Sequence, residues 1–188
     1  MFWWLAFLVL TIAGERLELN RVLRPTVAVR ARLAVTIALI VAGVTVSARR
    51  PEPGAPVMGA GLLALTGWLV RHDVARRTVR QRGVTRYMAI GLLAGYVWLG
   101  LGGLLTVMSG VTTPGLVYDA MLHAVFLGFV MSMVFAHAPV IFPAVLGRPL
   151  SYRPAFYLHV GVLHASLILP SPAISSTAWG GGGPGADC

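Results

Sequence analysis

The chain has 188 residues, of which 57% are hydrophobic and 11% charged, and its mean hydropathy is +0.79. Soluble domains are about half apolar and a quarter charged, so this composition excludes an ordinary soluble domain and predicts an integral membrane protein. The net charge of +9 comes from arginine alone. These arginines lie between apolar runs and not along one helix face, which argues against nucleic-acid binding.

Six apolar runs follow one another along the chain, at 2 to 13, 33 to 48, 55 to 70, 87 to 108, 116 to 136 and 154 to 169. About 20 helical residues cross the roughly 30 Å of a bilayer's hydrocarbon core. The pattern therefore predicts an all-α fold, a polytopic membrane helix bundle of about six transmembrane helices over residues 1–169. Its expected surroundings are the lipid bilayer and other membrane helices or subunits.

The arginines also predict how the bundle is oriented. The loops at 14 to 32, 71 to 86 and 148 to 153 are richer in arginine than the loops that alternate with them. Cytoplasmic loops collect arginine, so these three loops are expected inside and the N-terminus outside. We expect a multi-pass protein of the plasma membrane, and specifically of a bacterial inner membrane.

Both ends of the sequence depart from this pattern. The first run, FWWLAFLVLTIA, supplies only about 18 Å of helix, which predicts a chain truncated at its N-terminus. A signal peptide is the competing interpretation, but no basic segment precedes the run. Residues 170–188 are rich in Pro, Ser and Gly, and we expect them to form a disordered or out-of-frame tail. The single cysteine, Cys188, excludes an intrachain disulfide.

Small residues recur at intervals of four in the fourth and fifth runs, and such spacing lets membrane helices pack closely. They are Gly91 and Gly95, and then Gly128, Ser132 and Ala136. At about 100° per residue, the second set lies opposite Asp119, His123 and His137. The fifth helix is therefore predicted to have one packing face and one polar face, and the polar face also carries Met133.

Four of the five histidines fall in the last two predicted helices: His123, His137, His159 and His164. Any one of them could simply bond to a neighbouring helix. Together they predict a cofactor site, because neutral imidazole is the commonest nitrogen ligand of haem iron, copper and zinc. Asp119 could accept the imidazole proton of His123, carry protons, or act as an acid at a helix N-terminus. His72 lies in a basic loop and is expected at the surface.

The segments LHAVFLGFVMSMVFAHAPVIFPAVLG and FYLHVGVLHASL resemble the histidine-bearing spans of the NnrS family and, more distantly, subunit I of the haem-copper oxidases. Members of the NnrS family are larger, bind haem and copper, and are linked to the nitric oxide response. The resemblance implies a partial copy of such a protein. It shows no match to the oxidases' catalytic copper cluster. The 14-residue interval between His123 and His137 is also similar to that of membrane b-type cytochromes, but His159 and His164 do not repeat it.

The position of the last turn predicts which histidines meet. An antiparallel hairpin that turns near residue 150 brings His137 and His164 to the same membrane depth, so these two are the expected ligands of haem or copper, with His123 and His159 nearby. His159 and His164 are rotated by about 140° from each other, so one of them must have another role.

The alternative function is a non-enzymatic transporter or assembly subunit that uses its Asp and His groups for proton or ion passage. No phosphate-binding loop or nucleophile and base pair supports hydrolysis or phosphoryl transfer.

Overall fold

The structure is a computed structural model that describes residues 1–19, 26–110, 115–147 and 153–169. Every regular element in this part of the chain is helical, which confirms the predicted all-α fold. The elements are α1 (Phe2–Leu19), α2 (Val27–Ser47), α3 (Pro51–His72), α4 (Ala75–Thr78), α5 (Val84–Ser109), α6 (Leu116–Leu122), a π-helix (His123–Val130), α7 (Met131–Leu146) and α8 (Phe156–Ile168). The predicted tail, 170–188, lies outside the described residues.

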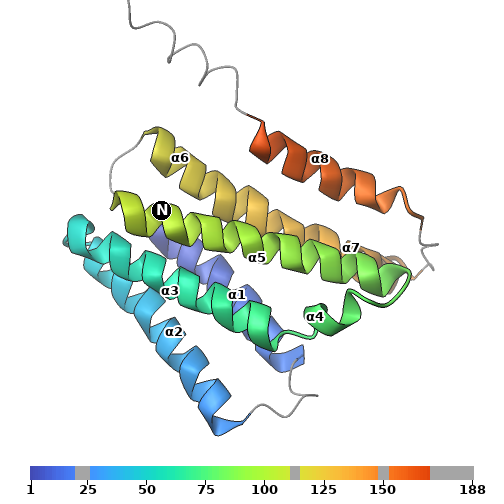
Figure 1. Cartoon of the computed structure of the whole chain (residues 1–188), viewed down its shortest axis with the longest axis horizontal. Helices are drawn as coiled ribbons and strands as arrows, with labels where there is room; N and C mark the ends of the chain where they lie inside the picture. The colour runs from blue at the N-terminus through green and yellow to red at the C-terminus, as the bar shows by residue number, and fades with distance from the viewer. Residues whose placement is uncertain (20–25, 111–114, 148–152, 170–188) are drawn as a thin grey trace, which may run out of the picture.

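The long helices lie side by side in one bundle (Figure 1). The central helix is α5, which packs against α3 on one side and against the continuous helix of α6, the π-helix and α7 on the other. α2 packs mainly on α3, as the outer member of a helical hairpin, and α8 lies against the π-helix.

Four helices in the described residues are long and apolar enough to cross a membrane: α2, α3, α5 and the continuous helix Leu116–Leu146. Four of the six predicted spans are therefore helices of the length and apolar composition that a span requires. The remaining two runs form α1, which ends in the charged segment Glu15–Leu19, and α8, which has only 13 residues. α2 begins at Val27, six residues before the predicted run, because long arginine side chains in its first turns can extend toward the aqueous phase.

Small residues line the contacts between neighbouring helices. In the α2–α3 hairpin a Cβ added at Gly43 would meet the Met58 backbone. Between α5 and the fifth span, a Cβ added at Gly91 would lie 3.0 Å from the Ala136 Cβ, and one at Gly95 would lie 3.1 Å from the Ser132 Cβ. The predicted packing of the small residues of α5 and the fifth span is confirmed. Such packing lets the backbones approach closely where apolar burial gives helices no preference for one another.

The predicted polar face of the fifth span is wrong in part, because eight residues in the middle of that span, His123–Val130, form a π-helix. A π-helix bonds each residue to the fifth one along, so it does not advance by 100° per residue. Residues beyond it are rotated away from the expected direction. Met133 consequently packs against α5, where its Cε would lie 2.7 Å from a Cβ added at Gly95, and not on a face with His123.

One end of the bundle carries most of the arginines. The end of α1, the start of α2, the end of α3 and the start of α5 lie at this end (Figure 1). We call it the Arg-rich end; its described arginines are Arg16, Arg30, Arg32, Arg71, Arg76, Arg77, Arg80, Arg82, Arg86 and Arg153. Only Arg49 and Arg50, between α2 and α3, lie at the opposite end of the described structure. The positive-inside rule predicts that the Arg-rich end faces the cytoplasm.

Candidate functional site

Four polar side chains from separate elements meet inside the bundle near the Arg-rich end. They are Arg16 of α1, Asp73 directly after α3, Tyr96 of α5 and His137 of α7, and we call them the buried polar cluster. Arg16 is 5% exposed, Asp73 6% and Tyr96 0%. Ionisable groups this deep in a helix bundle are expensive unless they are paired, and they commonly mark a pathway or a site.

The first half of the cluster is a contact between an arginine and a histidine. The Nη2 of Arg16 lies 2.5 Å from the Nε2 of His137, and the Nδ1 of His137 lies 2.6 Å from the carbonyl oxygen of Met133. A guanidinium group can only donate, so Nε2 accepts and the proton of this neutral imidazole is on Nδ1. The Nε of Arg16 is buried and has no hydrogen-bond partner among the described residues.

The second half of the cluster is a carboxylate held from two directions. The hydroxyl of Tyr96 donates to Oδ2 of Asp73 at 2.8 Å, and the backbone N–H of Ala75 donates to Oδ1 at 2.7 Å. The bond to Ala75 is local, since Asp readily caps the start of a following turn. It fixes the carboxylate at the end of α3, where the chain leaves the apolar span and enters α4.

The two halves act on each other electrostatically. Tyr96 is subject to the charges of both Asp73 and Arg16, and His137 to those of Arg16, Glu15 and Asp73. Arg16 and Asp73 carry opposite formal charges. Each therefore offsets part of the unfavourable burial of the other, because charge interactions are weakly screened in an interior of low dielectric constant.

A polar hollow connects this cluster with the Arg-rich end. The hollow has a volume of about 390 Å³ and is lined by Asp73 together with five cationic or titratable side chains, Arg71, His72, Arg76, Arg77 and Arg80. Asp73 thus has one side toward the hollow and accepts a hydrogen bond from Tyr96, in the bundle interior, on another. The arrangement places a titratable carboxylate between an arginine-lined entrance and buried polar groups.

The sequence-predicted histidines have separate surroundings. His123 is exposed, and its Nδ1 lies 2.7 Å from the backbone oxygen of Asp119, not from the carboxylate. His159 is exposed on α8. His72 was expected at the surface of a loop, but it ends α3, is half-buried and stacks on Trp68 with 5.2 Å between ring centroids.

His164 pairs with a tryptophan. The Nε1 of Trp98 on α5 donates to Nδ1 of His164 at 2.8 Å, and the two ring planes are nearly parallel, at 7°, with centroids 6.2 Å apart. Indole is only a donor, so the neutral imidazole carries its proton on Nε2, which is buried without a partner in the described structure. Trp98 also packs over Gly128, nine residues before His137.

The structure therefore does not bring the expected ligand pair, His137 and His164, to a common partner. His137 bonds to Arg16, and His164 bonds to Trp98. In these tautomers neither ring directs a free nitrogen lone pair outward. Across the described residues, no three or more His, Cys, Asp or Glu side chains gather in a group that could hold a metal ion. The haem or copper centre stays a prediction, and binding through these two histidines requires that both hydrogen bonds be given up.

Comparison with known proteins places the chain in a family. The model of a domain of unknown function, DUF8744, matches residues 1–179. The chain belongs to the DUF8744 family. No curated protein and no solved structure matches it significantly.

In this DUF8744 chain, sequence reasoning missed three of the four cluster residues. Arg16 had a readable signal, because it continues the buried stripe of α1, Leu5, Val9 and Ala13, at helical spacing. An arginine on the apolar face of a membrane helix indicates a buried charge. Asp73 stood among loop arginines, and Tyr96 stood in an apolar run, so neither had a pattern that separated it from ordinary solvated or packing residues.

Proposed function

We propose that the chain is a non-enzymatic membrane protein that passes protons across the bilayer through a buried relay, which begins at its Arg-rich end. The observation that carries the proposal is the position of Asp73, which lines the polar hollow and also accepts the hydroxyl of Tyr96 from inside. Intramembrane Asp and His groups commonly serve as proton relays.

The cluster supplies the groups that such a relay needs. Asp73 and His137 can each gain and lose a proton, and the hydroxyl of Tyr96 can donate and accept. A proton that enters through the hollow and binds Asp73 neutralises the carboxylate that offsets Arg16. The positive charge of Arg16, which contacts His137, is then no longer offset by Asp73. Proton binding at Asp73 therefore changes the electrostatic environment of His137.

The proposal includes a membrane setting. In it, α1 and α8 complete six spans, the Arg-rich end faces the cytoplasm, and the membrane is the inner membrane of a bacterium. The length of α1 supports its assignment as a span, because its 18 residues extend about 27 Å at 1.5 Å per residue. The arginine asymmetry supports the orientation.

The test is proton flux into sealed vesicles. The purified full chain is reconstituted in liposomes that contain a pH-sensitive dye, and a potassium diffusion potential drives proton entry. We expect flux above that of protein-free liposomes, and a loss of at least about tenfold in Asp73→Asn and His137→Gln, since each loses one protonatable group of the relay.

Asp119→Asn is the matched control, because it makes the same chemical change at an exposed acid at the other end of the bundle. It should keep the wild-type flux. Equal flux from wild-type and empty liposomes refutes the proposal, as does an equal loss in the Asp119 and Asp73 variants.

A histidine-ligated haem or copper centre linked to nitric oxide is the second candidate, and one observation favours it. The bond from Nδ1 of His123 to the Asp119 carbonyl leaves Nε2 as the nitrogen with a free lone pair, and ligating histidines are often oriented in this way. Optical absorption and metal analysis of the purified protein test it. A Soret band or bound copper that disappears in His123→Ala supports this candidate, and a colourless, metal-free, folded protein removes it.

A further inference from the structure

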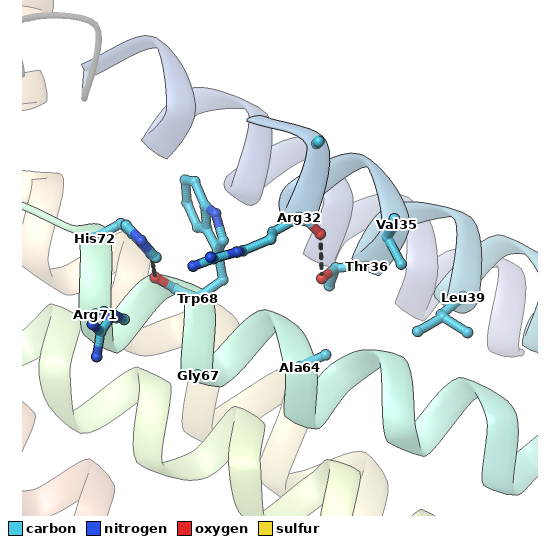
Figure 2. A pocket seen from close by; sticks show the side chains of 10 residues that line it. Arg32, Val35, Thr36, Leu39, Ala64, Gly67, Trp68, Arg71 and His72 are labelled. Carbon is cyan, nitrogen blue, oxygen red and sulfur yellow. Dashed lines mark hydrogen bonds between the residues drawn. The ribbon is translucent and has the colours of Figure 1, made fainter. Parts of the chain in front are cut away.

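A second hollow lies between α2 and α3 (Figure 2). It has a volume of about 490 Å³, which is within the range of about 300 to 1,000 Å³ typical of ligand pockets. Its lining changes in character along the two helices. Toward the middle of the helices it is apolar, with Val35, Leu39 and Ala64, and toward the Arg-rich end it carries Arg32, Arg71 and His72.

The apolar part of this hollow is open to the outside of the bundle. Val35 is 61% exposed and Leu39 is 37% exposed. A Cβ added at Gly67 meets nothing within 4 Å, so the glycine leaves real space beside α3. In a bilayer, a hollow on this outer surface is filled by acyl chains.

In the polar part, Trp68 and His72 are held by contacts that the structure shows, and two exposed arginines lie beside them. Figure 2 shows the Arg32 side chain extending from α2 across the hollow toward Trp68 on α3, with His72 beside it. Trp68 is itself fixed, since its Nε1 donates to the backbone oxygen of Val29 at 3.1 Å and its ring stacks on His72. The cationic rim is therefore attached to both helices of the hairpin.

This hollow adjoins the polar hollow beside Asp73. Arg71 and His72 line both, and the polar hollow adds Arg76, Arg77 and Arg80. Asp73 is the acidic residue among them, and both of its oxygens already accept hydrogen bonds. Together the two hollows form a surface with an apolar groove between α2 and α3 at one end and a cluster of arginines at the other.

We propose that this surface binds one anionic phospholipid of the leaflet at the Arg-rich end. The acyl chain occupies the apolar groove between α2 and α3, and the phosphate lies against Arg32 and Arg71. Charge complementarity selects an anionic head group over a zwitterionic one, because basic pockets between membrane helices on the cytoplasmic side bind such head groups. The site shares Arg71 and His72 with the hollow through which protons reach the proposed relay, but it uses neither Asp73 nor His137.

The experiment counts lipids on the intact protein. The full chain in detergent is titrated with phosphatidylglycerol or with phosphatidylcholine of the same acyl chains, and bound lipid is measured by native mass spectrometry. We expect tighter binding of phosphatidylglycerol. Each arginine near a membrane surface contributes about 1 kcal/mol, or about fivefold in affinity, so Arg32→Gln with Arg71→Gln should weaken binding about 25-fold.

Two further variants separate head-group and chain recognition. Arg49→Gln with Arg50→Gln removes the same charge at the opposite end of the hairpin and should leave binding unchanged. Gly67→Leu fills open space in the hollow, and it should weaken phosphatidylglycerol binding while the protein keeps its melting temperature.

Three results overturn the proposal. The first is equal wild-type affinity for the two lipids, a comparison that needs no variant. The second is a folded Arg32→Gln, Arg71→Gln double variant that binds phosphatidylglycerol as tightly as the wild type does, or an Arg49→Gln, Arg50→Gln control that loses as much affinity as that double variant. The third is full displacement of phosphatidylglycerol by millimolar inorganic phosphate, which would mean a phosphate site without chain recognition.

Discussion

Replacing Tyr96 by Phe removes one hydroxyl group and keeps the buried ring, so it tests the centre of the buried polar cluster with little change in packing. The hydroxyl donates to Oδ2 of Asp73 at 2.8 Å. Tyr96 is fully buried, and Asp73 is 6% exposed. In Tyr96→Phe that carboxylate oxygen loses its donor in a place that water reaches poorly, whereas the other oxygen keeps the Ala75 N–H.

The size of the effect follows from the charge on the acceptor. A hydrogen bond to a charged group contributes about 1.5 to 3 kcal/mol, whereas a neutral one contributes about 1 kcal/mol. For a chain of this length, 1 kcal/mol corresponds to about 2 to 4 °C in melting temperature. We expect Tyr96→Phe to lower the melting temperature by about 3 to 12 °C. In an Asp73→Asn background the acceptor is neutral, so the same substitution should lower it by about half as much.

The assay is thermal unfolding of the four proteins of this double-mutant cycle in one detergent, which isolates the coupling between the two side chains. Tyr118→Phe is the control, because Tyr118 is only partly buried and contacts Phe2 through its ring. It should change the melting temperature by less than about 1 °C. The reasoning fails if Tyr96→Phe is as mild as Tyr118→Phe, or if its effect is the same with Asp73 and with Asn at that position.

Three more predictions follow from the packing and the topology. Gly43→Ala should destabilise the protein by about 1 to 3 kcal/mol, because the new methyl group meets the Met58 backbone, whereas Gly67→Ala, which meets nothing within 4 Å, should be neutral or stabilising by up to about 1 kcal/mol; thermal unfolding compares them, and equal effects contradict the glycine contacts. In a Cys188→Ser background, cysteines introduced at Arg80 and at Arg49 should react with an impermeant reagent from opposite sides of the membrane, because α3 separates the two positions. Labelling of both from the same side contradicts α3 as a span. Trp98→Phe removes the donor to His164. Hydrogen exchange within α8 should then become about fivefold faster, the equivalent of about 1 kcal/mol, while exchange in α3 stays the same. Unchanged exchange in α8 contradicts the role of this bond in holding α8 against α5.

Much of the fold could be predicted because a bilayer leaves few solutions. Apolar runs of sufficient length must be helices, and this reasoning gave α2, α3, α5 and the fifth span. The spacing of Gly91 and Gly95, with Ser132 and Ala136, gave a correct helix contact, because close approach depends only on small residues along one stripe.

The direction of individual side chains was harder to predict, and the π-helix explains why. The sequence HAVFLGFV has no feature that separates it from an α-helix in hydropathy, yet it changes the rotation of every residue after it. His137 was expected on the face of His123, and it contacts Arg16 of α1. The depth argument that paired His137 with His164 took no account of Trp98, whose indole N–H holds His164 on α5.

Packing and charge are divided between different parts of the bundle, and this division bears on how the buried polar cluster can act. The closest backbone contacts join α2 to α3, α3 to α5 and α5 to α7. α1 makes few contacts with its neighbours by comparison, mainly to α2 and the π-helix, and its charged end is held by Arg16 on His137. In the proposed relay, a change in protonation at Asp73 alters the charge balance around Arg16, on a helix that none of the close glycine contacts in the described residues joins to its neighbours. α1 is therefore an element that can respond to a proton without disturbing the glycine contacts that join α2, α3, α5 and the fifth span.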